Sequence, residues 1–168
     1  MNILRALIDG LGFSVFMAVS SLLIVKYNPR FMLKSCPKSV VQQVAPQTTE
    51  EKRQFKRIAI PLQAAVMLAL LASILQCYWG TPVGYLTVAL HLLVVSMVWT
   101  VVDFLLDILL FCIAMPRFMV IPGTDRHSYK DYGQQLRGFL IGCGVSLAAS
   151  AVLGAALFGL LQLARFAV

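Results

Sequence analysis

Four long runs of apolar residues take up most of this 168-residue chain, and they restrict its fold more than any other feature. They cover about residues 6–25, 58–79, 85–115 and 138–163. Each run is long enough for a helix that crosses a bilayer, which takes about 20 residues. Because lipid cannot hydrogen-bond to backbone groups, each span should be helical. We therefore predict an all-α integral membrane four-helix bundle, with residues 1–168 forming a single polytopic domain.

The overall composition agrees with this prediction. Hydrophobic residues make up 60% of the chain and charged residues only 12%, and the mean hydropathy is +0.83. A soluble domain usually has about 45–50% apolar and about 25% charged residues. Only short stretches remain between the apolar runs, so we expect no soluble domain.

Basic residues are concentrated in two of the three connections between the runs. Of the 14 Lys and Arg residues, eight lie in loop 26–57 and four in loop 116–137, whereas the turn 80–84 has none. Short cytoplasmic loops carry an excess of Lys and Arg. We therefore expect both long loops on the cytoplasmic side and both termini on the extracytoplasmic side. This topology explains the net charge of +7 without a nucleic-acid partner, and anionic lipid headgroups are the expected partner.

The first apolar run has an alternative interpretation as a cleaved signal peptide. Arg5 would be its positive region, and Ala18-Val19-Ser20 resembles a cleavage site. The flank after the run is far more basic than the flank before it, which favours a retained span.

The sequence Pro-Arg-Phe-Met occurs twice, at residues 29–32 and 116–119, each time after an apolar run. Proline ends a helix, and the following Arg can reach headgroup phosphates while Phe and Met stay at the acyl boundary. We interpret both copies as segments that end a membrane helix and hold the chain at the bilayer surface, with Arg30 and Arg117 as candidate headgroup ligands. An internal duplication is the alternative, but the first loop is longer and the flanking spans do not align.

The second loop carries the densest polar chemistry outside the spans. Pro122-Gly123 predicts a type II turn. Backbone donors near Gly123, beside Arg126 and Lys130, can hold a phosphate or another anion. The alternative is an ordered surface turn followed by a short interfacial helix.

Two sequence patterns in the loops fit capping boxes at helix starts. Thr48 with Glu51 predicts that a helix begins in the first loop and continues into the second span. Ser128 with Asp131 predicts another helix start, which would place Tyr129 and Tyr132 at the membrane interface.

Three loop motifs resemble those of a family of small four-span bacterial membrane proteins with no established activity. They are Asn28-Pro29-Arg30, Val120-Ile-Pro-Gly-Thr124 and Tyr129-Lys-Asp-Tyr-Gly133. The resemblance extends over most of the chain through its two basic loops. It implies four spans and a bacterial cytoplasmic membrane, and it supplies no catalytic residues.

Trp99, Asp103 and Asp107 follow one another at i, i+4 and share one helix face. Asp103 lies about 27 Å along the helix from Tyr85, so it should lie near the inner edge of the hydrocarbon core. Three interpretations remain open. The pair forms ion pairs with Arg30, Arg117 or a neighbour, it binds a cation or proton in a transporter, or it shares a Mg²⁺ ion in an enzyme acting on a lipid headgroup.

Other chemical signals are weak. His91 is well rotated from Asp103, so we expect a packing or interfacial histidine. The four cysteines lack Cys-x-x-Cys spacing, which argues against a disulfide framework or a zinc site. We assign no catalytic residues, no metal ligands and no cofactor.

Small residues recur every four positions along the last span, at Gly138, Gly142, Ser146, Ser150 and Gly154. Such a surface lets another helix approach closely. Shorter stripes occur on the first span (Gly10, Ser14, Ala18) and on the second (Ala65, Ala69, Ser73). The helix-packing face belongs either to a tight bundle or to a homodimer or a larger membrane partner.

Our first functional hypothesis is a non-enzymatic membrane module, either an accessory subunit or a binder of lipid surface or partner, with a cytoplasmic working face. A small ion- or proton-coupled transporter acting as a homodimer is the alternative. A membrane enzyme that modifies lipid headgroups is the third.

Overall fold

The computed structural model describes residues 2–166, with the backbone only for Phe166, and this part of the chain is helical without a strand. Four of its helices are long and apolar enough to cross a membrane, which confirms the predicted all-α fold and the number of helices of spanning length. They are α1 (Ile3–Tyr27), α3 (Thr49–Tyr78), α4 (Tyr85–Asp107) and α5 (Tyr132–Phe166). A π-helical segment, Ile108–Ala114, continues α4.

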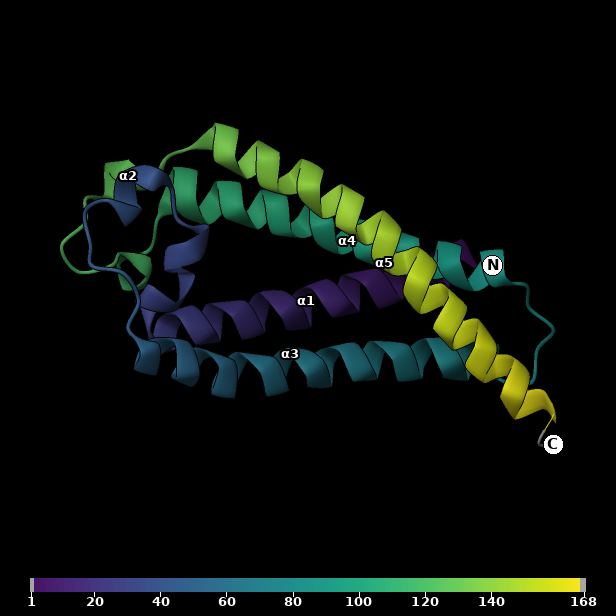
Figure 1. Cartoon of the computed structure of the whole chain (residues 1–168). Helices are drawn as coiled ribbons and strands as arrows, with labels where there is room; N and C mark the ends of the chain where they lie inside the picture. Colours follow the sequence, from purple (N-terminus) through teal and green to yellow (C-terminus); the bar gives the residue numbers. More distant parts are fainter. Residues whose placement is uncertain (1, 167–168) are drawn as a thin grey trace.

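The four long helices are not equivalent in their packing (Figure 1). α4 is central and packs against both α1 and α5, while α3 lies along α1 and hardly contacts α5. The two basic loops meet at one end of the bundle, which we call the loop end. The α3–α4 turn, the start of α1 and the end of α5 lie at the opposite end, which we call the turn end.

Glycines bring α5 and α4 into close contact. A Cβ atom on Gly154 would lie 2.9 Å from both Cα and Cβ of Ala89, and one on Gly142 would lie 3.1 Å from Cγ2 of Thr100. A larger side chain at Gly154 would therefore require α4 to move, whereas one at Gly142 would require the Thr100 side chain to shift. Gly138, by contrast, would have nothing within 4 Å of its Cβ, so the predicted packing face contacts α4 only from its second member onward.

Hydroxyl groups join the same two helices between these glycines. The Ser146 hydroxyl lies 2.9 Å from that of Thr100, and the Ser150 hydroxyl lies 3.2 Å from that of Ser96. In hydrocarbon such groups need internal partners. The stripe on α5 is thus used within the chain as a contact surface for α4.

The other two stripes differ from each other. On α1, a Cβ on Gly10 would lie 3.0 Å from Cβ of Val98, and Ser14 is buried, so this stripe packs against α4. On α3, Ala65 and Ala69 are exposed. The third member of this stripe, Ser73, contacts α1 through its hydroxyl, which donates to Asp9 Oδ1 at 3.1 Å, while the two alanines leave open space beside α1.

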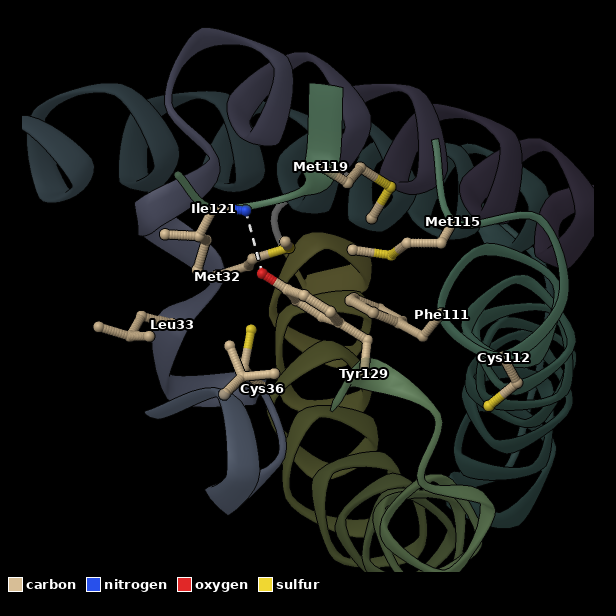
Figure 2. Packing of buried hydrophobic residues seen from close by; sticks show 10 residues of the cluster. Met32, Leu33, Cys36, Phe111, Cys112, Met115, Met119, Ile121 and Tyr129 are labelled. Atoms are coloured by element: carbon tan, nitrogen blue, oxygen red, sulfur yellow. Dashed lines mark hydrogen bonds between the residues drawn. The ribbon is translucent and has the colours of Figure 1, made fainter. Parts of the chain in front are cut away.

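The two loops share a hydrophobic core that closes the loop end (Figure 2). Each Pro-Arg-Phe-Met copy forms a 3-10 helix, Pro29–Ser35 and Arg117–Met119, and both Met32 and Met119 are buried in this core. The prediction that these methionines lie at the acyl boundary is therefore wrong, because the loops pack against each other. The core also includes Cys36, and burial raises the pKa of its thiol to about 12.

The loop conformation confirms two local predictions. Gly123 has φ +88°, and the Thr124 N–H donates to the Ile121 carbonyl at 3.1 Å, which is the predicted type II turn. Thr48 and Glu51 form the predicted capping box at the start of α3.

The second predicted capping box is wrong. Asp131, not Ser128, caps α5, since its Oδ1 accepts the Gln134 N–H at 2.9 Å. The Ser128 carbonyl instead accepts from the Ser39 hydroxyl at 2.7 Å, on helix α2 (Lys38–Val41) of the first loop. Tyr129 is fully buried rather than interfacial.

We expect Gly154→Ala to destabilise the protein and Gly159→Ala not to. Alanine normally favours a helix over glycine by roughly 0.5–1 kcal/mol. At Gly154 the new Cβ meets the α4 backbone, and such overpacking costs about 1–3 kcal/mol, whereas Gly159 would have nothing within 4 Å. Thermal unfolding in detergent, followed by circular dichroism, compares the two variants. Equal midpoints would contradict the close contact of α4 with α5.

Tyr129→Phe should destabilise the loop end. The Tyr129 hydroxyl accepts from the buried Ile121 N–H at 3.0 Å and lies 2.8 Å from the Thr124 hydroxyl. Leaving a buried donor unpaired costs about 1–3 kcal/mol. Amide hydrogen exchange at residues 117–129 should become faster, and the exposed Tyr132→Phe should leave it unchanged. Unaltered exchange in Tyr129→Phe would contradict this role of the hydroxyl.

Candidate functional site

Asp103 and Asp107 lie on α4 near the loop end, half-buried, and both face interior space. Two adjacent cavities, of about 240 and 260 Å³, are lined by this pair. The first lies against α1 and the loops, and the second against α5. Trp99 and Gln135 also line both. The carboxylates thus occupy the region where α1, α4, α5 and the loops converge.

Neither carboxylate has a protein partner among residues 2–165, where no hydrogen bond or ion pair involves its side chain. The predicted ion pair with Arg30 does not form. Arg30 instead binds Glu51 through two contacts, Nε to Oε1 at 2.6 Å and Nη2 to Oε2 at 3.4 Å. The physical reason is the capping box, which fixes Glu51 where it meets the planar guanidinium in a bidentate geometry.

Gln135 completes this site from the first turn of α5. Gln135 is only 8% exposed and lines both cavities. In the described part of the chain, its side-chain carboxamide has no hydrogen-bond partner, whereas the neighbouring Gln134 N–H donates to Asp131. Two carboxylates and an amide oxygen are hard oxygen ligands, which suit small hard cations. Their chemistry suits a proton or a small hard cation, although no group of three or more His, Cys, Asp or Glu side chains in the described part of the chain is arranged to hold a metal.

The Pro-Arg-Phe-Met copies contribute to the same site. Met32 and Met119 both line the cavity on the α1 side of the Asp pair, and both belong to the loop core (Figure 2). The two methionines thus belong both to the wall of this cavity and to the core that closes the loop end. Sequence reasoning missed this role, because the contact joins two loops that are far apart in the chain.

The predicted anion-binding residues do not line either cavity. Arg126 donates to the carbonyl oxygens of Met115 and, at 3.3 Å, of Ala114, and it thereby caps the end of the third span. Arg117, Gly123 and Lys130 are exposed at the loop end. The structure does not gather these residues into one pocket with the Asp pair.

A second polar cluster, missed by the sequence analysis, lies within the spans near the turn end. His91 of α4 is fully buried, its Nε2 lies 3.2 Å from Asp9 Oδ2, and its Nδ1 lies 2.9 Å from the Tyr78 hydroxyl. A carboxylate partner favours the proton on Nε2, so Nδ1 accepts from Tyr78. His91 is thus a buried network residue and not an interfacial one.

Asp9 is the centre of this cluster. Arg5 Nε donates to its Oδ2 at 3.2 Å, and the Ser73 hydroxyl donates to its Oδ1 at 3.1 Å. The available signal was an Arg–Asp pair at i, i+4 inside an apolar run, since an ionisable residue within a span needs a partner. Its other partners are 64 and 82 positions away, and no local pattern points to them.

Comparison of the chain with known protein families, with curated proteins and with solved structures finds no match.

Proposed function

We propose that the chain is a non-enzymatic multi-pass membrane protein that binds a small cation, a proton or a metal ion, at Asp103, Asp107 and Gln135. This proposal corresponds to the ion- or proton-coupled transporter of our second hypothesis. The observation that carries it is the pair of carboxylates that faces two cavities without a protein partner.

Energetics favour an occupant at this site. A carboxylate at the centre of a membrane span costs about 2.5–3.5 kcal/mol on insertion scales, and a half-buried carboxylate without a partner near the inner edge of the core keeps part of that cost. A bound cation or proton offsets it. Both carboxylates face cavities inside the chain, which a small ion can enter more readily than a side chain of a partner subunit, and this favours cation binding over our first hypothesis.

The position of the site suggests how the cation reaches it. Met32, Ser35 and Met119 of the loops line part of the cavity on the α1 side. The shortest approach to the site is therefore from the loop end. Displacement of the methionine side chains would open it, since methionine is unbranched and adaptable.

We further propose that the loop end faces the cytoplasm of a bacterial cell and both chain ends face outward. The asymmetric distribution of Lys and Arg supports this orientation. Exposed basic side chains such as Arg117 and Lys130 would then lie at the anionic inner leaflet.

Asp103→Asn and Asp107→Asn should each weaken cation binding without loss of stability. An unpaired carboxylate contributes no ion pair, so neutralising it should leave the thermal midpoint of the cation-free protein unchanged or higher. Mn²⁺ binding by electron paramagnetic resonance measures a metal ion, and infrared difference spectra across a pH step measure a carboxyl proton. If the ligand is a metal ion, each substitution should weaken Mn²⁺ binding at least about tenfold, the factor for one lost charged contact. If the ligand is a proton, each substitution should remove the infrared band of the carboxyl group.

Asp125→Asn is the control, because this exposed aspartate lies in the second loop. Variants at Asp103 and Asp107 that match Asp125→Asn in both measurements would exclude the proposed site. A large loss of stability in either variant would instead indicate a structural role.

The proposed orientation predicts the accessibility of two engineered cysteines. In a background without the four native cysteines, Thr81→Cys lies at the turn end and Lys52→Cys near the loop end, and both positions are exposed. A membrane-impermeant maleimide should label the Thr81→Cys variant in intact bacteria and the Lys52→Cys variant only after permeabilisation. The reverse pattern would invert the topology.

A further inference from the structure

A groove of about 570 Å³ runs along the seam between α1 and α3, at some distance from the Asp103–Asp107 site. Its lining is largely apolar, with polar residues at the turn end. From α1 it is lined by Ile8, Gly12 and Phe16, and from α3 by Leu62, Ala65 and Ala69.

Small residues create the depth of this groove. A Cβ on Gly12 would have nothing within 4 Å, and Ala65 and Ala69 are exposed to the groove from the other side. The lining extends from Arg5 to Phe16 on α1, which is about 16 Å at 1.5 Å per residue. Since both helices are spans, the groove lies in the acyl region and is aligned with the lipid chains.

At the polar end of the groove, the Arg5 guanidinium has N–H donors without an acceptor among the described residues. Arg5 donates through Nε to Asp9 Oδ2 at 3.2 Å and through Nη2 to the Ser73 hydroxyl at 2.9 Å. An arginine has five N–H donors, and the others have no hydrogen-bond partner among residues 2–165. Its side chain is 46% exposed. His91 holds Asp9 from the protein interior at 3.2 Å, which fixes Arg5 at this end.

We propose that the groove binds one anionic phospholipid, with an acyl chain along α1 and α3 and the phosphate on Arg5. The order of polarity matches a lipid, because the cationic residue lies in the first turn of α1 and the apolar lining continues deeper into the span. Arginine binds phosphate in a bidentate manner, and free donors remain for it. A helix from a second copy would fill the apolar part but would leave these donors without an anion.

Ala69→Leu and Ala72→Leu provide a matched test of the acyl-chain site. Ala69 lines the groove, whereas Ala72 is exposed on α3 and does not line it. Native mass spectrometry of the full chain in a neutral detergent, with added phosphatidylglycerol, reports the retained lipid. We expect Ala69→Leu to retain it about tenfold less, the factor that corresponds to one lost favourable contact, and Ala72→Leu to match the original chain.

Arg5→Gln tests the headgroup contact separately. It should lower the preference for phosphatidylglycerol over phosphatidylcholine about tenfold, as expected for loss of a charge-assisted hydrogen bond. Arg165→Gln is the control, because it removes an exposed positive charge near the same end of the bundle. Since the substituted residues lie outside the Asp103–Asp107 cavities, cation binding should be unaffected by either change.

Three results would overturn the proposal. Equal lipid retention in Ala69→Leu and Ala72→Leu would exclude the groove as the acyl-chain site. An unchanged headgroup preference in Arg5→Gln would exclude the phosphate contact. A dimer in the spectrum that Ala69→Leu alone dissociates would assign the groove to a second copy of the chain.

Discussion

Close backbone approach between α4 and its two neighbours is the constraint on which the rest of this structure depends. Gly154 and Gly142 of α5 let α4 approach closely on one side, and Gly10 of α1 lets it approach closely on the other. In lipid, helices gain little from hydrophobic burial and associate through packing and interhelical hydrogen bonds. Small residues on both flanks therefore make α4 the central helix. α3, which lacks such a contact with α4, stays on the outside of α1 and leaves a groove.

This arrangement places acidic residues in two contrasting environments within the same membrane-spanning unit. Asp9 receives hydrogen bonds from Arg5 and Ser73 and lies within hydrogen-bonding distance of His91. Asp103 and Asp107 face cavities instead. A protein that only needed stability could have satisfied both clusters in the same way, since partners such as Arg30 lie on the adjoining loop. The difference supports a structural role for the first cluster, which orients Arg5, and a ligand-binding role for the second.

Local rules predicted the elements of this fold, and long-range contacts determined what the sequence could not show. Apolar run length predicts the spans, the Pro122-Gly123 pair predicts the type II turn, and Thr48 with Glu51 predicts the start of α3, because each depends on neighbouring residues only. The burial of Tyr129 depends on residues of the first loop, and the Asp9 partner His91 lies 82 positions away. The Asp103–Asp107 pair was visible from its spacing, but Gln135 was not, because its contribution arises from the approach of α5.

The two copies of the Pro-Arg-Phe-Met sequence have the same residues, but most of these residues have different exposures and contacts in the two copies. Phe31 is 6% exposed and Phe118 is 43% exposed, and Arg30 binds Glu51 whereas Arg117 remains exposed. Only the methionines share an environment, beside the Asp103–Asp107 cavity. Proline ends the helix at both sites, and a 3-10 turn then directs the third following residue inward. In both loops this geometry places the methionine of the repeat in the wall of one cavity and in one hydrophobic core.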